Sequence, residues 1–235
     1  MTEGAQKRMG FSAIGGREAK AEKILAILAA ADSPLKPADR VLDLGCGSGE
    51  IAARLAKLAQ VSCADAIDQR TQGKELPFHL VRDTLPFADG AFDIVVSNHV
   101  IEHVSEPAIH LREVRRVLRP GGIAYLATPN RWWPWEFHAR LPLLHFLPTE
   151  LFSRLAMRWG RLTEPVQLLS LGQLKGLAGS LFDIDVWHPR LLHEPGRYAL
   201  QVSTAVGGML RLIPQSLLHA SAGLQPTLIL LLRAR

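Results

Sequence analysis

The sequence has few cysteines and no long apolar run. Cys46 and Cys63 are the only cysteines among 235 residues, too few for a disulfide framework or a zinc site built from CxxC pairs. No apolar stretch reaches the roughly 18–20 residues of a membrane-spanning helix. The first 16 residues lack the apolar core of a secretory signal. We therefore expect a cytoplasmic protein with reduced cysteines and no transmembrane segment.

A dense cluster of Lys and Arg is also missing, although the formal net charge is +5. Residues 1–130 carry 16 basic and 16 acidic side chains, whereas residues 131–235 carry 11 and 6. All five tryptophans lie in this second part as well. Without a basic cluster, DNA is not an expected partner. The basic excess is either a solvated face or a surface for an acidic or phosphorylated partner.

Predicted strands and helices alternate up to Asn130. Apolar runs and helix formers predict helices at 17–31, 50–59 and 105–119, and strands at 40–44, 61–65, 78–83, 92–98 and 123–130. Ser105 is the expected N-cap of the third helix, with Pro107 in its first turn. Such alternation is typical of right-handed βαβ units, so the fold class is α/β with a parallel, helix-covered sheet.

The pattern is looser after Asn130. Residues 131–165 are rich in Trp, Pro and Arg and show no clean period. Beyond them we expect a weak helix at 171–181 and strands at 182–187 and 227–233. Between these strands, residues 197–220 are predicted to be helical, with breaks at Gly207–Gly208 and at Pro214.

The strongest local motif is VLDLGCGSGE, residues 41–50, between a strand and a helix. Its glycines permit a sharp turn and a close approach to a ligand. Glu50 stands where the dinucleotide fingerprint needs Gly or Ala, which disfavours NAD and FAD, and the GK[ST] of a nucleotide P-loop is absent. Asp43, inside the strand, would repel a pyrophosphate but could hold a ligand ammonium.

Two further carboxylates follow the next strands. Asp65 ends the second strand, where a carboxylate can accept both hydroxyls of a ribose, and Asp68 is the alternative. Asp83 ends the third predicted strand and could accept a hydrogen bond from an adenine amino group. Acids at three consecutive strand ends predict a ligand with ammonium, ribose and adenine parts.

Several motifs resemble one enzyme family in order and spacing. VLDLGCGSGE, residues 82–104 and residues 111–122 are similar to motifs of the Rossmann-like S-adenosylmethionine-dependent methyltransferases, in the small-molecule branch with the type 11 domain. The resemblance covers about residues 38–130. It implies a three-layer sandwich whose mostly parallel seven-stranded sheet has an antiparallel last strand, with a lid inserted after strand five.

The resemblance also implies one methyltransferase domain over residues 1–235. Its parts are a cofactor-binding core at 17–130, a lid at 131–170, and C-terminal strands six and seven with a helical insert at 171–235. The cofactor would be S-adenosyl-L-methionine, and the product S-adenosyl-L-homocysteine. Its expected contacts are Asp43, Gly45, Cys46, Gly47, Gly49 and Asn98 around the methionine end, Asp65 at the ribose, and Ala66, Asp83 and Thr84 at the adenine.

Methyl transfer from a sulfonium needs alignment, exclusion of water and sometimes a base. The candidate bases are His99, His103, His138 and His145. Glu102 could orient His103 or bind a metal, but the sequence offers no second and third ligand, so we expect no metal.

The lid is the expected acceptor site. Trp132, Trp133 and Trp135 would form apolar walls and Arg131 would meet an anion, unless these residues only pack the lid on the sheet. Residues 189–224 could lie on a membrane surface, shape a lipid-like acceptor pocket or form a dimer interface, although simple core packing is favoured.

The predicted function is therefore S-adenosylmethionine-dependent methylation of a small-molecule or lipid-like acceptor, at oxygen. One alternative is a protein that binds the cofactor without turnover. A nicotinamide-dependent oxidoreductase is opposed by Asp43 and Glu50. RNA methylation stays open because of the basic second part, although SNHV replaces the NPPY-type tetrapeptide of base methyltransferases after strand four.

Overall fold

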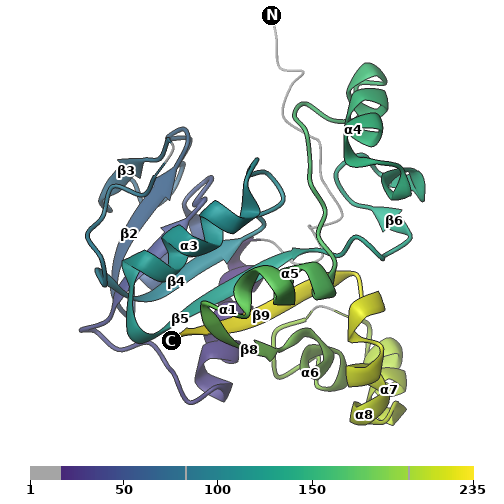
Figure 1. Cartoon of the computed structure of the whole chain (residues 1–235). Coiled ribbons are helices and arrows are strands. Elements are labelled where there is room, and N and C mark those ends of the chain that lie inside the picture. Colours follow the sequence, from purple (N-terminus) through teal and green to yellow (C-terminus); the bar gives the residue numbers. More distant parts are fainter. Residues whose placement is uncertain (1–16, 83, 201) are drawn as a thin grey trace, which may run out of the picture.

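The computed structural model describes residues 17–82, 84–200 and 202–235. A single large sheet is flanked by helices on both faces (Figure 1). In chain order the helices are α1 (Arg17–Ala30), α2 (Glu50–Leu55), α3 (Pro107–Val117), the 3-10 turn η2 (Leu144–Phe146), α4 (Thr149–Arg158), α5 (Leu171–Ala178), α6 (His188–His193), α7 (Thr204–Leu212), α8 (Gln215–Ala220) and the 3-10 turn η3 (Ala222–Leu224). The strands are β1 (Arg40–Leu44), β2 (Gln60–Asp65), β3 (Phe78–Leu80), β4 (Phe92–Asn98), β5 (Leu118–Pro129), β6 (Trp135–Glu136), β7 (Leu141–Pro142), β8 (Phe182–Val186) and β9 (Thr227–Ala234).

The seven-stranded sheet has the order β3-β2-β1-β4-β5-β9-β8. Strands β1 to β5 are parallel, while β9 is antiparallel to both β5 and β8. This confirms the mostly parallel sheet with an antiparallel last strand. The chain switches sides between β1 and β4, and such switch points open a crevice at the carboxyl ends of the strands.

Each face of the sheet buries its own apolar layer. On one face, Leu111 and Val114 of α3 pack with Leu174 of α5, and these two helices lie in front of the sheet in Figure 1. On the other face, Ile24 of α1 and Leu191 of α6 pack against the strands. Central strands covered on both sides need a nearly continuous apolar sequence, which explains why RVLDL and TLILLLR could be recognised.

Several predicted boundaries need correction. Helix α3 begins at Pro107 with Glu106 in the N-cap position, so Ser105 as the cap is wrong. Helix α7 continues through Gly207–Gly208, because an interior glycine lowers helix stability by only about 1 kcal/mol and the Ser203 hydroxyl caps the helix by accepting from the Val206 amide at 3.3 Å. The break at Pro214 is confirmed.

Two other elements are shorter than expected. Helix α2 ends at Leu55. Strand β3 ends at Leu80 rather than at residue 83. Asp83 lies outside the described residues, and so does its predicted contact with the adenine.

Residues 131–170 form a separate small structure beyond the carboxyl end of β5, with β6 and α4 standing clear of the sheet (Figure 1). We call these residues the lid. The lid has an apolar cluster of its own, formed by Ala139, Phe152, Ala156, Leu162, Val166 and Leu168. Its return to the sheet is held by a bridge between Asn130 and Leu169.

Helices α7 and α8 leave much of their apolar surface uncovered. Leu218 is buried, but Met209 and Leu212 are 69% and 84% exposed. Core packing therefore accounts for only part of residues 189–224. In the described part of the chain, the helices are too short or too polar to cross a membrane.

Candidate active site

A cavity of about 880 Å³ opens at the carboxyl ends of β1, β2 and β4. Several residues predicted to contact the cofactor or to act as the base line this cavity: Gly45, Cys46, Gly47, Asp65, Ala66, Thr84, Asn98, His99 and His103. The structure thus brings together residues from four different loops. Asp43 and Gly49 lie outside this lining.

The glycine-rich loop holds its shape through two positions that require glycine. Gly45 has a φ of 73°, and a Cβ there would lie 2.2 Å from Cγ2 of Val100. Gly49 has a φ of 81°, and a Cβ there would lie 2.1 Å from the Gln72 carbonyl oxygen. Any other residue would be strained at both positions. Gly49 does not line the cavity, and it shapes the loop by allowing the close approach of the Gln72 carbonyl.

Asp65 joins the loop to the end of β2. One carboxylate oxygen accepts the Gly47 amide at 2.8 Å, and the other accepts the Ala66 amide at 2.7 Å. The alternative residue, Asp68, is engaged by the Arg70 guanidinium at 2.9 Å and is not part of the cavity lining. Of these two carboxylates, Asp65 is the one placed for a ligand.

Two buried oxygens beneath the loop have no hydrogen-bond partner: Oδ2 of Asp43 and Oδ1 of Asn98. Buried polar atoms are nearly always paired, so such atoms beside a cavity point to a ligand group. Burial, and next the nearby Cys63 thiol, raise the pKa of Asp43 to about 8. A ligand cation placed there would restore the ionised carboxylate.

His99 lines the cavity with a strained backbone and a carboxylate partner. Its backbone has a φ of 60°, which is rare outside glycine, and its Nδ1 lies 3.1 Å from Oε1 of Glu102. Glu102 is buried and also accepts the Thr128 hydroxyl at 2.9 Å. Burial lowers the pKa of His99. Although burial opposes it, the His99 hydrogen bond holds the pKa of Glu102 below its usual value.

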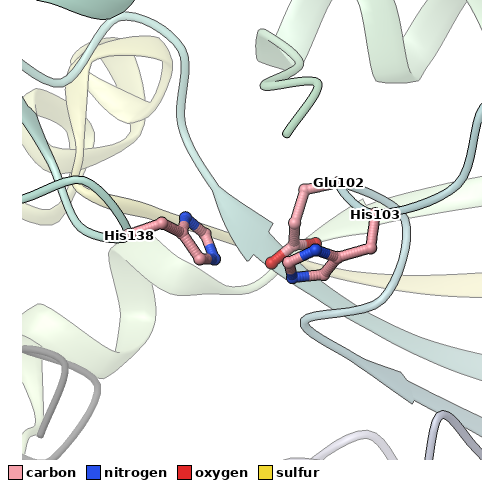
Figure 2. A group of neighbouring side chains, drawn as sticks. All are labelled: Glu102, His103 and His138. Atoms are coloured by element: carbon pink, nitrogen blue, oxygen red, sulfur yellow. The ribbon is translucent and has the colours of Figure 1, made fainter. Parts of the chain in front are cut away.

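His103 and His138 meet where the lid touches the sheet edge, with ring centroids 5.2 Å apart (Figure 2). Nδ1 of His103 lies 3.0 Å from Glu164 of the lid, and Nδ1 of His138 lies 2.8 Å from Glu136. His103 lines the cavity, whereas His138 lies outside its lining.

The predicted acceptor residues lie elsewhere on the lid. Arg131, Trp132, Trp133 and Trp135 are not among the described residues that line the cavity. Trp132 and Trp135 are 54% and 41% exposed. These two side chains therefore lie on the surface of the lid.

Among the cavity residues that were not predicted from the sequence are two titratable side chains, His110 and Glu164. His110 of α3 lies 3.2 Å from the Ser97 hydroxyl, and burial lowers its pKa to about 4. Glu164 lies in the segment that returns from α4 to the sheet, where it lines the cavity beside His103. Neither residue belongs to a local motif, so no signal in the sequence could have located them.

Residues 42–126 match the family model of the methyltransferase domain. This part of the chain resembles a methyltransferase domain. Over 153 residues the chain is 31% identical to a ubiquinone biosynthesis O-methyltransferase of Ruegeria pomeroyi, and the alignment covers 59% of each protein. The chain thus spans less than two thirds of this relative's length.

Solved structures resemble this chain over most of its length. An S-adenosylmethionine-dependent methyltransferase from Mesorhizobium loti has a TM-score of 0.57 at 19% identity, covering 88% of this chain and 97% of that one. Phosphoethanolamine N-methyltransferase 2 of Haemonchus contortus, in complex with S-adenosyl-L-methionine, has a TM-score of 0.55 at 17% identity, covering 91% of this chain and 51% of that one. Because both sequence identities are low, these two likenesses show the fold alone.

Proposed function

We propose that this protein transfers the methyl group of S-adenosylmethionine to an oxygen of a small-molecule or lipid-like acceptor, as a single domain with residues 131–170 as its lid. The observation that carries the proposal is the convergence of the glycine loop, Asp65 and the unpartnered Asn98 oxygen on one cavity of about 880 Å³. The O-methyltransferase relative supports oxygen as the acceptor atom.

The cavity residues fit the cofactor group by group. The unpartnered oxygen of Asn98 suits the ammonium of the methionine end, and Asp65 suits the ribose hydroxyls. Asp43, with its own unpartnered oxygen, lies outside the lining. Ala66 and Thr84 line the part of the cavity expected to take the adenine. When bound, S-adenosylmethionine supplies a methyl group activated on a sulfonium. The chain's own task is to hold both reactants in line.

We assign His99 as the general base. It lines the cavity, and Glu102 holds its Nδ1, which leaves Nε2 to take the proton of the acceptor hydroxyl. Because its pKa is lowered, the imidazole is neutral at pH 7 and able to accept that proton. His138 is less suited because it lies outside the cavity lining. His103 is less suited because its partner, Glu164, is exposed, whereas Glu102 beside His99 is buried.

Calorimetric binding of S-adenosylmethionine and S-adenosylhomocysteine tests the cofactor assignment. In Asp65→Asn both affinities should fall by about 10-fold or more, because a hydrogen bond to a charged group contributes about 1.5–3 kcal/mol. Asp68→Asn is the matched control and should bind normally. Wild-type protein that folds but binds neither compound would contradict the proposal.

Turnover on a panel of hydroxylated acceptors tests the base. His99→Gln should bind S-adenosylhomocysteine normally and lose about 10²–10⁴-fold in rate, the usual contribution of a general base. An unchanged rate would remove His99 from this role. Binding without turnover across the panel would favour the alternative of a catalytically silent protein.

We also propose that helices α7 and α8 rest on an anionic membrane surface, where a lipid-like acceptor would be found. Met209, Leu212, Leu217 and Leu224 are all more than half exposed, and no Asp or Glu follows Glu194. Wild-type protein should sediment with phosphatidylglycerol vesicles, and Met209→Glu/Leu212→Glu should stay in the supernatant. Equal sedimentation of both proteins would exclude this surface.

A further inference from the structure

We propose that Glu102, His103 and His138 bind a divalent transition-metal ion where the lid meets the sheet edge. One ligand atom from each of the three side chains lies within 4.8 Å of the other two. Figure 2 shows the His138 ring turned toward the Glu102 carboxylate and the His103 ring. Two of the ligands follow β4 and the third comes from the lid, which explains why no ligand set could be named from the sequence.

Both imidazoles are prepared for a metal by a carboxylate behind them. Glu164 lies 3.0 Å from Nδ1 of His103, and Glu136 lies 2.8 Å from Nδ1 of His138. A carboxylate there fixes the tautomer with the proton on Nδ1 and leaves the lone pair on Nε2. Metal-bound histidines almost always have such a partner on the other ring nitrogen.

The charge around the cluster favours a cation. Glu102, Glu136 and Glu164 place three carboxylates around the two rings, and both Glu102 and Glu136 are 1% exposed. Buried carboxylates are costly unless a positive charge or hydrogen bonds compensate them. Glu102 and Glu136 already accept hydrogen bonds from Thr128 and Ala139, and a bound cation would add to this compensation.

The donor set selects the kind of metal. Two imidazoles and one carboxylate suit Zn²⁺ and its first-row neighbours, whereas Mg²⁺ prefers oxygen ligands alone. Three protein ligands leave one coordination position open. Of the three ligands, His103 lines the cavity, so a bound ion would lie beside it.

A bound ion would have two effects. It would tie the lid, through His138, to the loop after β4. On the proposed function, the open position would also receive the acceptor oxygen and make its proton easier to remove. This second effect depends on methyl transfer, while metal binding does not.

Zinc binding to untagged, chelator-treated protein tests the site. We expect one Zn²⁺ per chain in equilibrium dialysis and a higher melting temperature in its presence. His103→Ala and His138→Ala should weaken Zn²⁺ binding by about 100-fold or more. Glu164→Gln should weaken it by about 10–100-fold, the usual effect of losing the carboxylate behind a ligand. His219→Ala, on the exposed face of α8, is the control and should bind Zn²⁺ like the wild type.

Three results would overturn the site: no Zn²⁺ bound by the wild type, an unchanged affinity in His138→Ala, or tighter binding of Mg²⁺ than of Zn²⁺. Melting of each metal-free variant identifies loss of folding. The exposed Glu164 variant keeps the test valid if a buried substitution unfolds the chain. S-adenosylhomocysteine binding is measured in the same proteins, so failure of the metal site and failure of the proposed function give different results.

Discussion

Single residues in this protein show two kinds of requirement, one for shape and one for charge. Gly45 and Gly49 are required for shape, since both have left-handed backbones and no room for a Cβ. Asp43 and Asn98 have buried oxygens without partners, which lower the stability of the free protein and suit a polar ligand. Functional sites commonly retain such locally unfavourable groups.

Gly45→Ala should destabilise the protein and abolish cofactor binding. The left-handed backbone costs a residue with a Cβ about 1–2 kcal/mol, and the clash with Val100 adds about 1–3 kcal/mol. Gly121→Ala is a matched control, because Gly121 has the same φ of 73° with no atom within 4 Å of the added Cβ. Urea unfolding should therefore show a larger loss for Gly45→Ala. Equal losses would show that the Val100 contact is relieved at little cost.

The buried Asp43 should make stability depend on pH. Its folded pKa of about 8 is above the unfolded model value of 3.8, so between these values the folded state binds more protons. The contribution of Asp43 to stability is then largest below pH 4 and is lost as the pH rises toward 8.

Asp43→Asn, which imitates the neutral carboxyl, should lack this dependence. Relative to wild type, the melting temperature of the variant should therefore rise from pH 5 to pH 9. S-adenosylhomocysteine should reduce the difference by ionising Asp43 in the wild type. Parallel pH profiles of the two proteins would contradict the raised pKa.

Among the elements, the lid is the part that folds around its own small core. Phe152 and Ala156 of α4 are almost fully buried in the lid cluster, while polar contacts such as the one between Gln167 and the Glu102 carbonyl join the lid to the sheet. An element of this kind can loosen while the main sheet stays folded.

Phe152→Ala should loosen the lid selectively. Removing a buried Phe side chain costs about 3–5 kcal/mol, here within the lid cluster. Hydrogen exchange should accelerate across residues 139–168, while the sheet amides and S-adenosylhomocysteine binding stay unchanged. Leu151→Ala is the control, since Leu151 is 42% exposed. Acceleration spread evenly over the whole chain would show that the lid does not unfold independently.

The whole molecule depends on β9, which lies between β5 and β8 and so joins the C-terminal part to the parallel core. Its central residues are buried on both faces of the sheet. Antiparallel pairing extends from Ile123–Arg233 to Pro129–Thr227. The last strand in the sequence is therefore an interior strand of the sheet, next to the edge strand β8.

Leu230→Ala should lower the free energy of unfolding of the entire domain by about 2–5 kcal/mol, because Leu230 is fully buried in the larger core. Chemical denaturation should show one transition at a lower midpoint. Leu224→Ala, at a 64% exposed position, should leave the midpoint unchanged. A second transition for Leu230→Ala would indicate that the C-terminal part unfolds separately.

Local patterns in the chain were enough for the parallel strands, the glycine loop and the position of Asp65. These features depend on residues close in sequence: apolar runs define the strands, and a loop after a parallel strand lies at the carboxyl edge of the sheet. The break predicted at Gly207–Gly208 was wrong, because propensity is a weak guide where a cap and neighbouring turns hold the helix.

Only the tertiary structure decided how distant side chains meet. His138 and Glu164 of the lid lie beside His103, which follows β4. Trp132 and Trp135 of the same segment are exposed. Such contacts depend on how one packed unit settles on another. This arrangement comes from the sum of many weak contacts and is not encoded in any short segment of the chain.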